Sequence, residues 1–287
     1  MCLDDVTDTE YDLVVAYQGY DPGVTCQALH KLKSKKKIVW LHGECIESNI
    51  VMAMLGMQFK KFHTVFCVSD SIRKYAIEKF AGLQNVEVFY NLLNREEILK
   101  KADMPFEKPS HPDGTVLCTV GRLSSKKGQD MIPEIVRLLL DAGKNVYWYL
   151  VGEGPLREKI ISECRKYGVQ DYVFLIGSQD NPYPYIKACS IYIQTSLTEG
   201  WGLTVQEARI LHKPIVVTPV PVFNEQITSG ENGLIVDSMT PEALFEGIKT
   251  LLDHPEMCEK FVDNLKKEDH DNTDELQKLY DFIEGKK

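Results

Sequence analysis

The feature of this 287-residue sequence that most constrains its fold is the alternation of short, continuously apolar segments with longer segments of helical periodicity. The apolar segments are residues 13–17, 37–41, 64–68 and 86–90, followed by residues 116–120, 146–151, 173–176, 191–194 and 215–218. Apolar strands separated by helices are typical of a parallel sheet that is covered by helices on both faces. The sequence therefore predicts an α/β protein.

Residues 108–114 interrupt this alternation, because two prolines and a glycine fall within seven residues. Such a segment is typical of a linker. We therefore expect two α/β lobes, residues 1–108 and residues 109–287, and the second contains a helix at residues 274–283 near its end. The first lobe offers about four strands, fewer than the six or so of a doubly wound nucleotide-binding lobe. We expect it to be incomplete.

Composition and charge exclude several classes of protein. The formal net charge is −9, and an acidic chain is a poor general binder of nucleic acid. No apolar run approaches the roughly 18 residues of a membrane span. The eight cysteines show no CxxC pair or zinc-type spacing. Scattered cysteines and an acidic amino-terminal segment predict a cytoplasmic protein without a secretory signal.

A basic loop follows the strand expected at residues 116–120. Gly121 allows the chain to turn away from the strand, and Arg122 with Lys126 or Lys127 could hold one anion. Ligands of open α/β sheets bind beyond the carboxyl ends of the strands. The sequence therefore favours a phosphate site at this loop, with a solvated basic loop as the alternative.

A second segment follows the strand expected at residues 191–194 and leads into a helix. The backbone amides of residues 200–203, which are Gly200, Trp201, Gly202 and Leu203, could hold a phosphate at the helix N-terminus. Glu199 precedes the helix and Glu207 lies within it, about 12 Å away if the intervening residues are helical. One diphosphate-linked ligand could contact both glutamates. The alternative is an acidic residue favoured by the helix dipole and a surface glutamate.

Taken together, Arg122, Lys127, Glu199 and Glu207 resemble the motif of the retaining GT-B glycosyltransferases of family 4, also called group 1 glycosyltransferases. Segments 151–156, 174–177, 213–218 and 231–236 fit the same family. The resemblance is strong over residues 115–252 and thinner over residues 12–94. The sequence departs from the family in lacking a glycine-rich start and much of the acceptor-side region.

The resemblance implies two Rossmann-like lobes that face each other across a cleft, the N-terminal lobe lacking its first half. It also implies that the helix at residues 274–283 returns to the first lobe. It implies retaining transfer of a sugar from a nucleotide diphosphate donor to a glycan or lipid-linked acceptor, as in polysaccharide biosynthesis. Arg122 and Lys127 would hold the diphosphate without a metal ion or other cofactor. Glu207 would bind the ribose hydroxyls. Glu199 and the amides of residues 200–203 would hold the transferred sugar and the phosphate.

His42 follows an expected strand of the first lobe and matches the family histidine that faces the sugar. The residues alone favour a structural histidine at this position. Tyr183, Tyr185 and Trp201 are expected to be packing or rim residues. Asp269-His270-Asp271 matches the metal-binding motif of GT-A enzymes, but no strand precedes it, so we expect no metal site there.

The short first lobe leaves a second interpretation open. The chain could be a truncated, non-catalytic donor-binding fragment, or one subunit of a split enzyme that a complementing chain completes. A GT-B sugar-nucleotide epimerase fits the motif less well. The lysines within residues 31–37 could contact anionic lipid at the inner face of the membrane, with a solvated helix end as the alternative.

Overall fold

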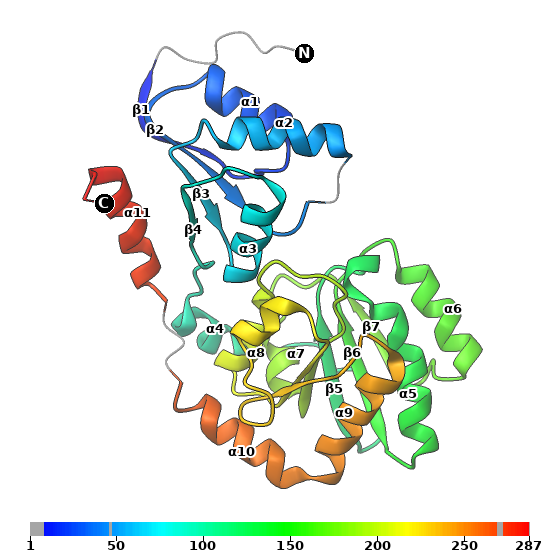
Figure 1. The fold of residues 1–287 in the computed structure, drawn as a ribbon. Coiled ribbons are helices and arrows are strands. Elements are labelled where there is room, and N and C mark those ends of the chain that lie inside the picture. The colour runs from blue at the N-terminus through cyan, green and yellow to red at the C-terminus, as the bar shows by residue number, and fades with distance from the viewer. Residues whose placement is uncertain (1–8, 46–47, 269–271, 287) are drawn as a thin grey trace. The chain divides into compact units, whose positions relative to one another are not determined.

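The computed structural model describes residues 9–45, 48–268 and 272–286 (Figure 1). The chain divides into two compact units. Unit 1 comprises Met1–Leu92 and Asn272–Lys287, and unit 2 comprises Leu93–Asp271. Each unit is built on a parallel sheet, as the alternation of apolar and helical segments predicts.

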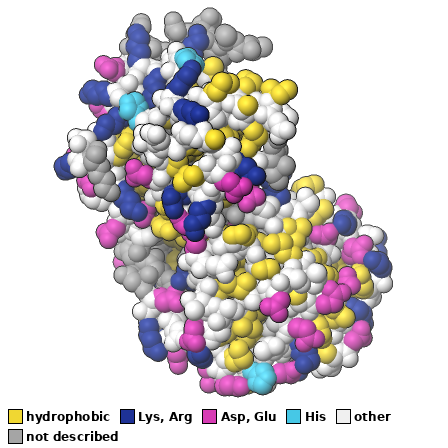
Figure 2. Space-filling view, viewed as in Figure 1, with side chains coloured by type: hydrophobic (Ala, Val, Ile, Leu, Met, Phe, Trp, Pro, Cys, Tyr) yellow, Lys and Arg dark blue, Asp and Glu magenta, His cyan; other side chains and the backbone are white. Residues whose placement is uncertain are grey.

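Unit 1 contains four parallel strands in sequential order β1-β2-β3-β4. They are β1 (Glu10–Ala16), β2 (Lys33–Leu41), β3 (Thr64–Cys67) and β4 (Val86–Val88). The intervening helices are α1 (Pro22–His30), α2 (Asn49–Phe59) and α3 (Asp70–Lys79). Helix α2 buries Leu55 and Phe59, whereas its Ile50, Met54 and Met57 side chains are exposed. Figure 2 shows hydrophobic side chains at the surface among the charged ones.

The C-terminal helix α11 (Asp274–Glu284) belongs to unit 1 (Figure 1). Its Phe282 packs on the buried cluster of Ile38, Phe66 and Phe89. The Lys36 ammonium also donates a hydrogen bond to the Phe282 carbonyl oxygen. Helix α11 therefore returns to the first unit, as the family resemblance implies, although the range 109–287 had grouped it with the second unit.

Unit 2 contains six parallel strands in the order β10-β9-β8-β5-β6-β7. They are β5 (Thr115–Val120), β6 (Val146–Val151), β7 (Val173–Gly177), β8 (Ile191–Gln194), β9 (Ile215–Val217) and β10 (Leu234–Ile235). The chain first proceeds from β5 to β7 on one side, and then returns to place β8 on the other side of β5. The strand order therefore reverses between β5 and β8, which is where doubly wound sheets bind ligands.

Helices cover both faces of the unit 2 sheet. One face carries α5 (Ile132–Asp141), α6 (Arg157–Tyr167), α9 (Pro241–Asp253) and α10 (Pro255–Leu265), and the other carries α7 (Tyr183–Ala188) and α8 (Leu203–Ile210). Strand β5 serves both cores, because Leu117 faces the first set of helices while Val116 and Cys118 face the second. Burial on both faces explains why this strand is apolar throughout.

Helix α4 (Arg95–Ala102) also belongs to unit 2, where it packs against α7 and α8. Its Ile98 is buried, and the Asn181 side chain donates to the Lys101 carbonyl oxygen at 2.9 Å. The expected linker at residues 108–114 lies within unit 2, where the His111 ring is hydrogen-bonded to the Tyr149 hydroxyl at 2.7 Å. The boundary expected after residue 108 is instead found between Leu92 and Leu93.

The lysines of residues 31–37 lie at the start of β2 and are largely engaged within unit 1. Lys35 pairs with Asp12 at 2.9 Å, and Lys37 donates to the carbonyl oxygens of Leu29 and Leu32 at 2.6 and 2.7 Å. Contact of these lysines with anionic lipid stays a prediction. None of the helices in the described ranges has the length and apolar character needed to cross a bilayer.

Candidate functional site

The loops that follow β5 and β8 are adjacent, because these strands pair at the point where the strand order reverses. The Leu197 amide donates to the Lys126 carbonyl oxygen at 2.8 Å, and the Thr195 hydroxyl donates to the Lys127 carbonyl oxygen at 2.7 Å. Gly128 adopts a left-handed conformation in which a Cβ atom would lie 2.4 Å from the Thr195 carbonyl oxygen. The two predicted ligand-binding segments are therefore joined along their backbones.

The turn after β6 supports the β5 loop. The Gly121 amide donates to the Val151 carbonyl oxygen at 2.9 Å, which extends the strand pairing beyond β5. A Cβ atom on Gly152 would lie 2.1 Å from the Gly121 carbonyl oxygen, and one on Gly154 would lie 2.3 Å from that of Leu123. The glycines of segment 151–156 thus permit the close approach that fixes the β5 loop.

Gln129 holds the β5 loop from within and was not identified from the sequence. Its side chain is fully buried, donates to the Arg122 carbonyl oxygen at 2.9 Å and accepts from the Ser124 amide at 3.3 Å. The Arg122 side chain is exposed, and in the described part of the chain it has no ion-pair partner. Its guanidinium group is therefore available to an anionic ligand.

Lys127 and Glu199 form an ion pair across the two loops. Their side chains are only 23% and 13% exposed, so the pair is partly shielded from water. The Glu199 Oε2 atom also accepts from the Ser196 hydroxyl at 3.3 Å. The resemblance placed both residues at one ligand, but it did not predict that they pair with each other.

A chain of buried hydrogen bonds stands behind Glu199. The Tyr192 hydroxyl donates to Gln194 Oε1 at 2.9 Å, and Gln194 Nε2 donates to the Ser196 hydroxyl at 2.8 Å. All three side chains are fully buried, and burial raises the pKa of Tyr192 well above its ordinary value. The sequence signal for this network is the presence of polar residues at alternate positions of an otherwise apolar strand. Through the Ser196 hydroxyl, the network fixes the position of Glu199.

The N-terminus of α8 lies beside this pair. Gly202 adopts a left-handed conformation there, and a Cβ atom on it would lie 2.8 Å from the Phe223 ring. The Gln226 side chain donates to the Trp201 carbonyl oxygen, and the Trp201 ring packs against the core between the sheet and α7–α8. Among the described residues no side chain caps α8, so its first turn can receive an anion.

Glu207 lies one turn further along α8 and has two unequal oxygens. Its Oε1 atom accepts from the Tyr183 hydroxyl at 3.3 Å, whereas Oε2 is buried and has no hydrogen-bond partner among the described residues. Burial raises the pKa of Glu207 from 4.5 to about 7, and the Tyr183 hydrogen bond partly opposes this shift. Tyr183, expected to be only a packing or rim residue, thus contacts a predicted binding residue.

His42 follows β2 in unit 1. Its ring lies 4.3 Å from that of Tyr17 and is stacked parallel to that of Trp40 at 6.0 Å. Burial lowers the pKa of His42, and a hydrogen bond to the Tyr17 backbone partly opposes the shift. Its Nε2 atom is buried without a hydrogen-bond partner among the described residues. The imidazole therefore has a lowered pKa and keeps one ring nitrogen unused.

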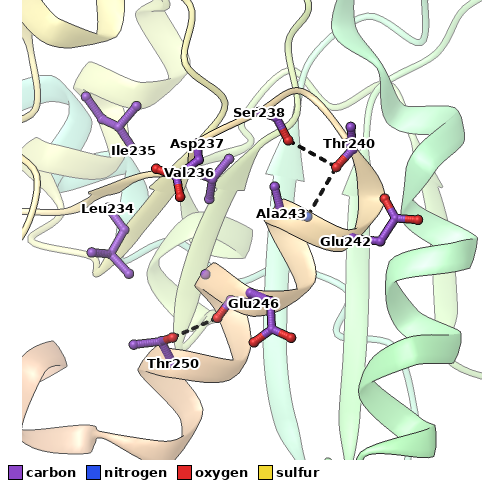
Figure 3. Close-up of a pocket in the computed structure, with 11 residues that line it drawn as sticks. Leu234, Ile235, Val236, Asp237, Ser238, Thr240, Glu242, Ala243, Glu246 and Thr250 are labelled. Atoms are coloured by element: carbon purple, nitrogen blue, oxygen red, sulfur yellow. Dashed lines mark hydrogen bonds between the residues drawn. The ribbon is translucent and has the colours of Figure 1, made fainter.

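A separate groove of about 440 Å³ lies between β10 and the first turns of α9 (Figure 3). Asp237, Glu242 and Glu246 line it, and the Thr240 hydroxyl caps α9 by accepting from the Ala243 amide at 3.3 Å. This concentration of carboxylates would repel a diphosphate. The groove is therefore a poorer site for an anionic ligand than the loops after β5 and β8.

The described ranges contain no group of three or more histidine, cysteine, aspartate or glutamate side chains arranged to hold a metal ion. The motif formed by Asp269, His270 and Asp271 lies outside the described residues.

The family of the chain follows from the segment that builds this site. The family model of glycosyl transferases group 1 matches residues 100–268, more than half of the chain and nearly all of unit 2. The chain belongs to this family. The matched segment includes the β5 loop, the β8 loop and helix α8, so the predicted donor residues lie within the family domain.

Curated relatives and solved structures agree with this family assignment. The chain is 26% identical to an uncharacterized glycosyltransferase of Methanocaldococcus jannaschii over 209 residues, which are 69% of this chain and 52% of that protein. It is 24% identical to the Campylobacter jejuni N-acetylgalactosamine-N,N'-diacetylbacillosaminyl-diphospho-undecaprenol 4-alpha-N-acetylgalactosaminyltransferase over 200 residues, again 69% and 52%. The chain thus spans about half the length of these family members.

The fold matches GT-B glycosyltransferase structures. Anabaena HepE in complex with UDP superimposes with a TM-score of 0.80 at 17% identity, over 96% of this chain and 79% of HepE. A TarM variant of S. aureus in complex with UDP and saccharide ligands superimposes with a TM-score of 0.77 at 17% identity, over 94% of this chain and 55% of TarM. These likenesses establish the expected α/β class with two parallel-sheet lobes.

Proposed function

We propose that this chain binds a nucleotide diphosphate sugar and transfers the sugar, with retention at the anomeric carbon, to a glycan or lipid-linked acceptor. The observation that carries the proposal is the junction of the β5 and β8 loops. There Arg122, the Lys127–Glu199 pair and the N-terminus of α8 belong to two directly linked segments. Cationic groups and open helix amides are the chemistry that recognises a diphosphate.

In this proposal the diphosphate is held by protein groups alone, without a metal ion or cofactor. Arg122 offers a planar fork of donors, and Lys127 offers a positive charge that its partner Glu199 keeps in place. The diphosphate gains negative charge as the bond to the sugar breaks. Fixed cations and helix amides stabilise that charge more than they stabilise the bound donor, and this difference lowers the barrier.

Glu207 and Glu199 have different proposed roles because they lie at different places along the ligand path. Glu207, on α8, has a buried oxygen without a partner and would accept from the ribose hydroxyls. Glu199 precedes α8 and would contact the transferred sugar, as would His42 from unit 1. The unused ring nitrogen of His42 supports this role, because a sugar hydroxyl would satisfy it.

The nucleotide is proposed from the complexes of structurally similar proteins. HepE was crystallised with UDP and with UDP-glucose, and TarM with UDP. We propose a uridine nucleotide first and a guanosine nucleotide second. A lipid-linked acceptor would place the protein in the cytoplasm and at the inner face of the membrane, and this rests on the acceptor class rather than on lysines 31–37.

Calorimetric titration with UDP and with GDP, in the presence of EDTA, tests the donor site. Arg122→Ala and Lys127→Ala should each weaken binding by about 1.5–3 kcal/mol, the range for charge-assisted hydrogen bonds. Lys127→Ala should have the larger effect because it also leaves the Glu199 carboxylate unpaired beside the diphosphate. Lys126→Ala is the matched control, since it removes an exposed charge from the next residue of the loop.

Unchanged affinity in both Arg122→Ala and Lys127→Ala would refute the donor site. Transfer or hydrolysis of the sugar nucleotide by the unmodified chain then tests catalysis. Tight donor binding without turnover on any acceptor would support the second interpretation, a non-catalytic fragment or a split subunit that requires a complementing chain.

A further inference from the structure

Tyr183 contacts the carboxyl group proposed to bind the donor ribose. It is the first residue of α7, and its hydroxyl donates to Glu207 Oε1 across the space between α7 and α8 at 3.3 Å. Both helices pack on the same face of the unit 2 sheet. This contact therefore joins two elements of the donor lobe.

The two carboxyl oxygens of Glu207 differ in their surroundings, and this difference indicates a role for the hydrogen bond from Tyr183. Oε1 is occupied by Tyr183, while Oε2 is buried and has no partner among the described residues. A buried acceptor without a donor is costly, so the site favours a ligand that brings a hydroxyl to Oε2. With Oε1 held, the carboxyl plane is fixed before such a ligand arrives.

We propose that Tyr183 is a positioning residue for the donor ribose, holding Oε1 of Glu207 so that Oε2 accepts from a ribose hydroxyl. This inference rests on the proposed function, which assigns Glu207 to the ribose. Tyr183 acts through Glu207 and contacts the carboxyl group rather than the reacting atoms. Its removal should therefore weaken ribose recognition selectively.

The charge state of Glu207 makes this role measurable, because it predicts the direction in which the pH dependence of binding should change. Burial raises the pKa of Glu207 to about 7, and the hydrogen bond from Tyr183 lowers it. Two other ionisable groups lie near this contact, the buried Tyr192 hydroxyl of β8 and Glu97 of α4. The charge of Glu97 raises the pKa of Tyr183, and Glu97 is itself paired with Lys101 at 2.6 Å. Loss of the Tyr183 hydroxyl should raise the pKa of Glu207, so that its ionised form is reached only at higher pH.

The experiment compares UDP with 2′-deoxy-UDP, and GDP with 2′-deoxy-GDP, by calorimetry between pH 6 and pH 8.5. Both members of a pair carry the same diphosphate, so the ratio of their affinities removes the titration of the phosphate. The unmodified chain should prefer the ribonucleotide, increasingly as Glu207 ionises. In Tyr183→Phe this preference should fall by about three- to tenfold at pH 7, the effect of one lost hydrogen bond. In this variant the preference for the ribonucleotide should also begin to rise at a higher pH.

Tyr185→Phe is the matched control, because Tyr185 lies on the same helix but donates to the Glu107 carbonyl oxygen at 3.2 Å. It should leave the preference unchanged. In a Glu207→Gln background, Tyr183→Phe should cause no further loss of preference, since the group through which it acts has been replaced.

The outcomes separate the two proposals. If neither UDP nor GDP binds the unmodified chain, the proposed function fails and this inference fails with it. If the nucleotide binds with a ribose preference that Tyr183→Phe leaves unchanged in size and pH dependence, the proposed function stands and the positioning role is overturned. An equal loss in the Glu207→Gln background would also overturn it, because Tyr183 would then act through the general packing of α7.

Discussion

Replacing Glu207 with glutamine should stabilise unit 2 at alkaline pH even as it weakens donor binding. Burial raises the pKa of Glu207 from 4.5 to about 7, so between these values the folded protein retains a proton that the unfolded chain has lost. A raised carboxyl pKa makes ionisation oppose folding. The penalty begins as pH rises through 4.5, grows up to about pH 7 and is constant above it.

The size of the penalty follows from the shift. A difference of about 2.5 pKa units, at 1.36 kcal/mol per unit, gives an upper limit of about 3 kcal/mol above pH 8. Glutamine carries no charge at any of these pH values and escapes this cost. The stability of Glu207→Gln relative to the unmodified protein should therefore increase by about 2–3 kcal/mol between pH 5 and pH 8.

Urea unfolding followed by tryptophan fluorescence would measure this change. Trp40 is the tryptophan of unit 1, so a Trp40→Phe background leaves Trp148 and Trp201 to report on unit 2. Glu246→Gln is the control, because it removes the same charge from an exposed position on α9. A stability difference for Glu207→Gln that is constant with pH, or that shrinks as pH rises, would refute the reasoning.

Three further predictions concern catalysis, the site backbone and unit 1. Glu199→Gln should lower kcat in a sugar-transfer assay far more than it raises the Kd for the nucleotide, and equal effects on both would argue against a contact with the sugar. Gly154→Ala should reduce both the melting temperature and donor affinity, because its Cβ atom would lie 2.3 Å from a carbonyl oxygen, whereas Gly143→Ala meets no atom within 4 Å and should spare donor affinity. Phe282→Ala should destabilise unit 1 by about 1–3 kcal/mol and speed hydrogen exchange in β2 and β3 but not in β5. Tyr280→Ala, a change at an exposed position, should change neither. An equal increase in hydrogen exchange throughout the chain would contradict the assignment of α11 to unit 1.

The strands at the centre of unit 2 could be predicted from the sequence almost to the residue. Strands β6 and β8 span the predicted residues 146–151 and 191–194, because each is buried on both faces and is therefore apolar from end to end. The adjacency of the two site loops also followed from the sequence. Carboxyl ends of parallel strands meet at one edge of a sheet, so motifs after two such strands converge.

The edge of unit 1 could not be predicted as well. Strand β1 begins at Glu10 and β2 at Lys33, several residues before their apolar segments. The early residues of β1 are exposed. In the part of the chain that the structure describes, they pair only with the lysine-rich start of β2, and that start pairs with no other strand. Hydrogen bonds of the backbone rather than burial hold this region, and an apolar pattern does not reveal them.

The contacts that organise the site were likewise beyond the sequence. The buried amide of Gln129, the ion pair of Lys127 with Glu199 and the hydroxyl of Tyr183 on Glu207 each join segments that are separated by turns or strands. The sequence identified the glutamates and the basic residues through their combined resemblance to the family motif. Which polar groups hold them in place depends on distances that only the folded chain provides.

The return of α11 to unit 1 gives the chain an unusual order of assembly during its synthesis. Unit 1 is discontinuous: all of unit 2, from Leu93 to Asp271, is made between its two parts. At roughly 5–20 residues per second, the buried cluster of Ile38, Phe66 and Phe89 is synthesised about 10–40 s before the helix that packs on it. Unit 2 emerges as one uninterrupted segment and can fold during that interval. Of the two units, unit 1 is thus begun before unit 2 and completed after it.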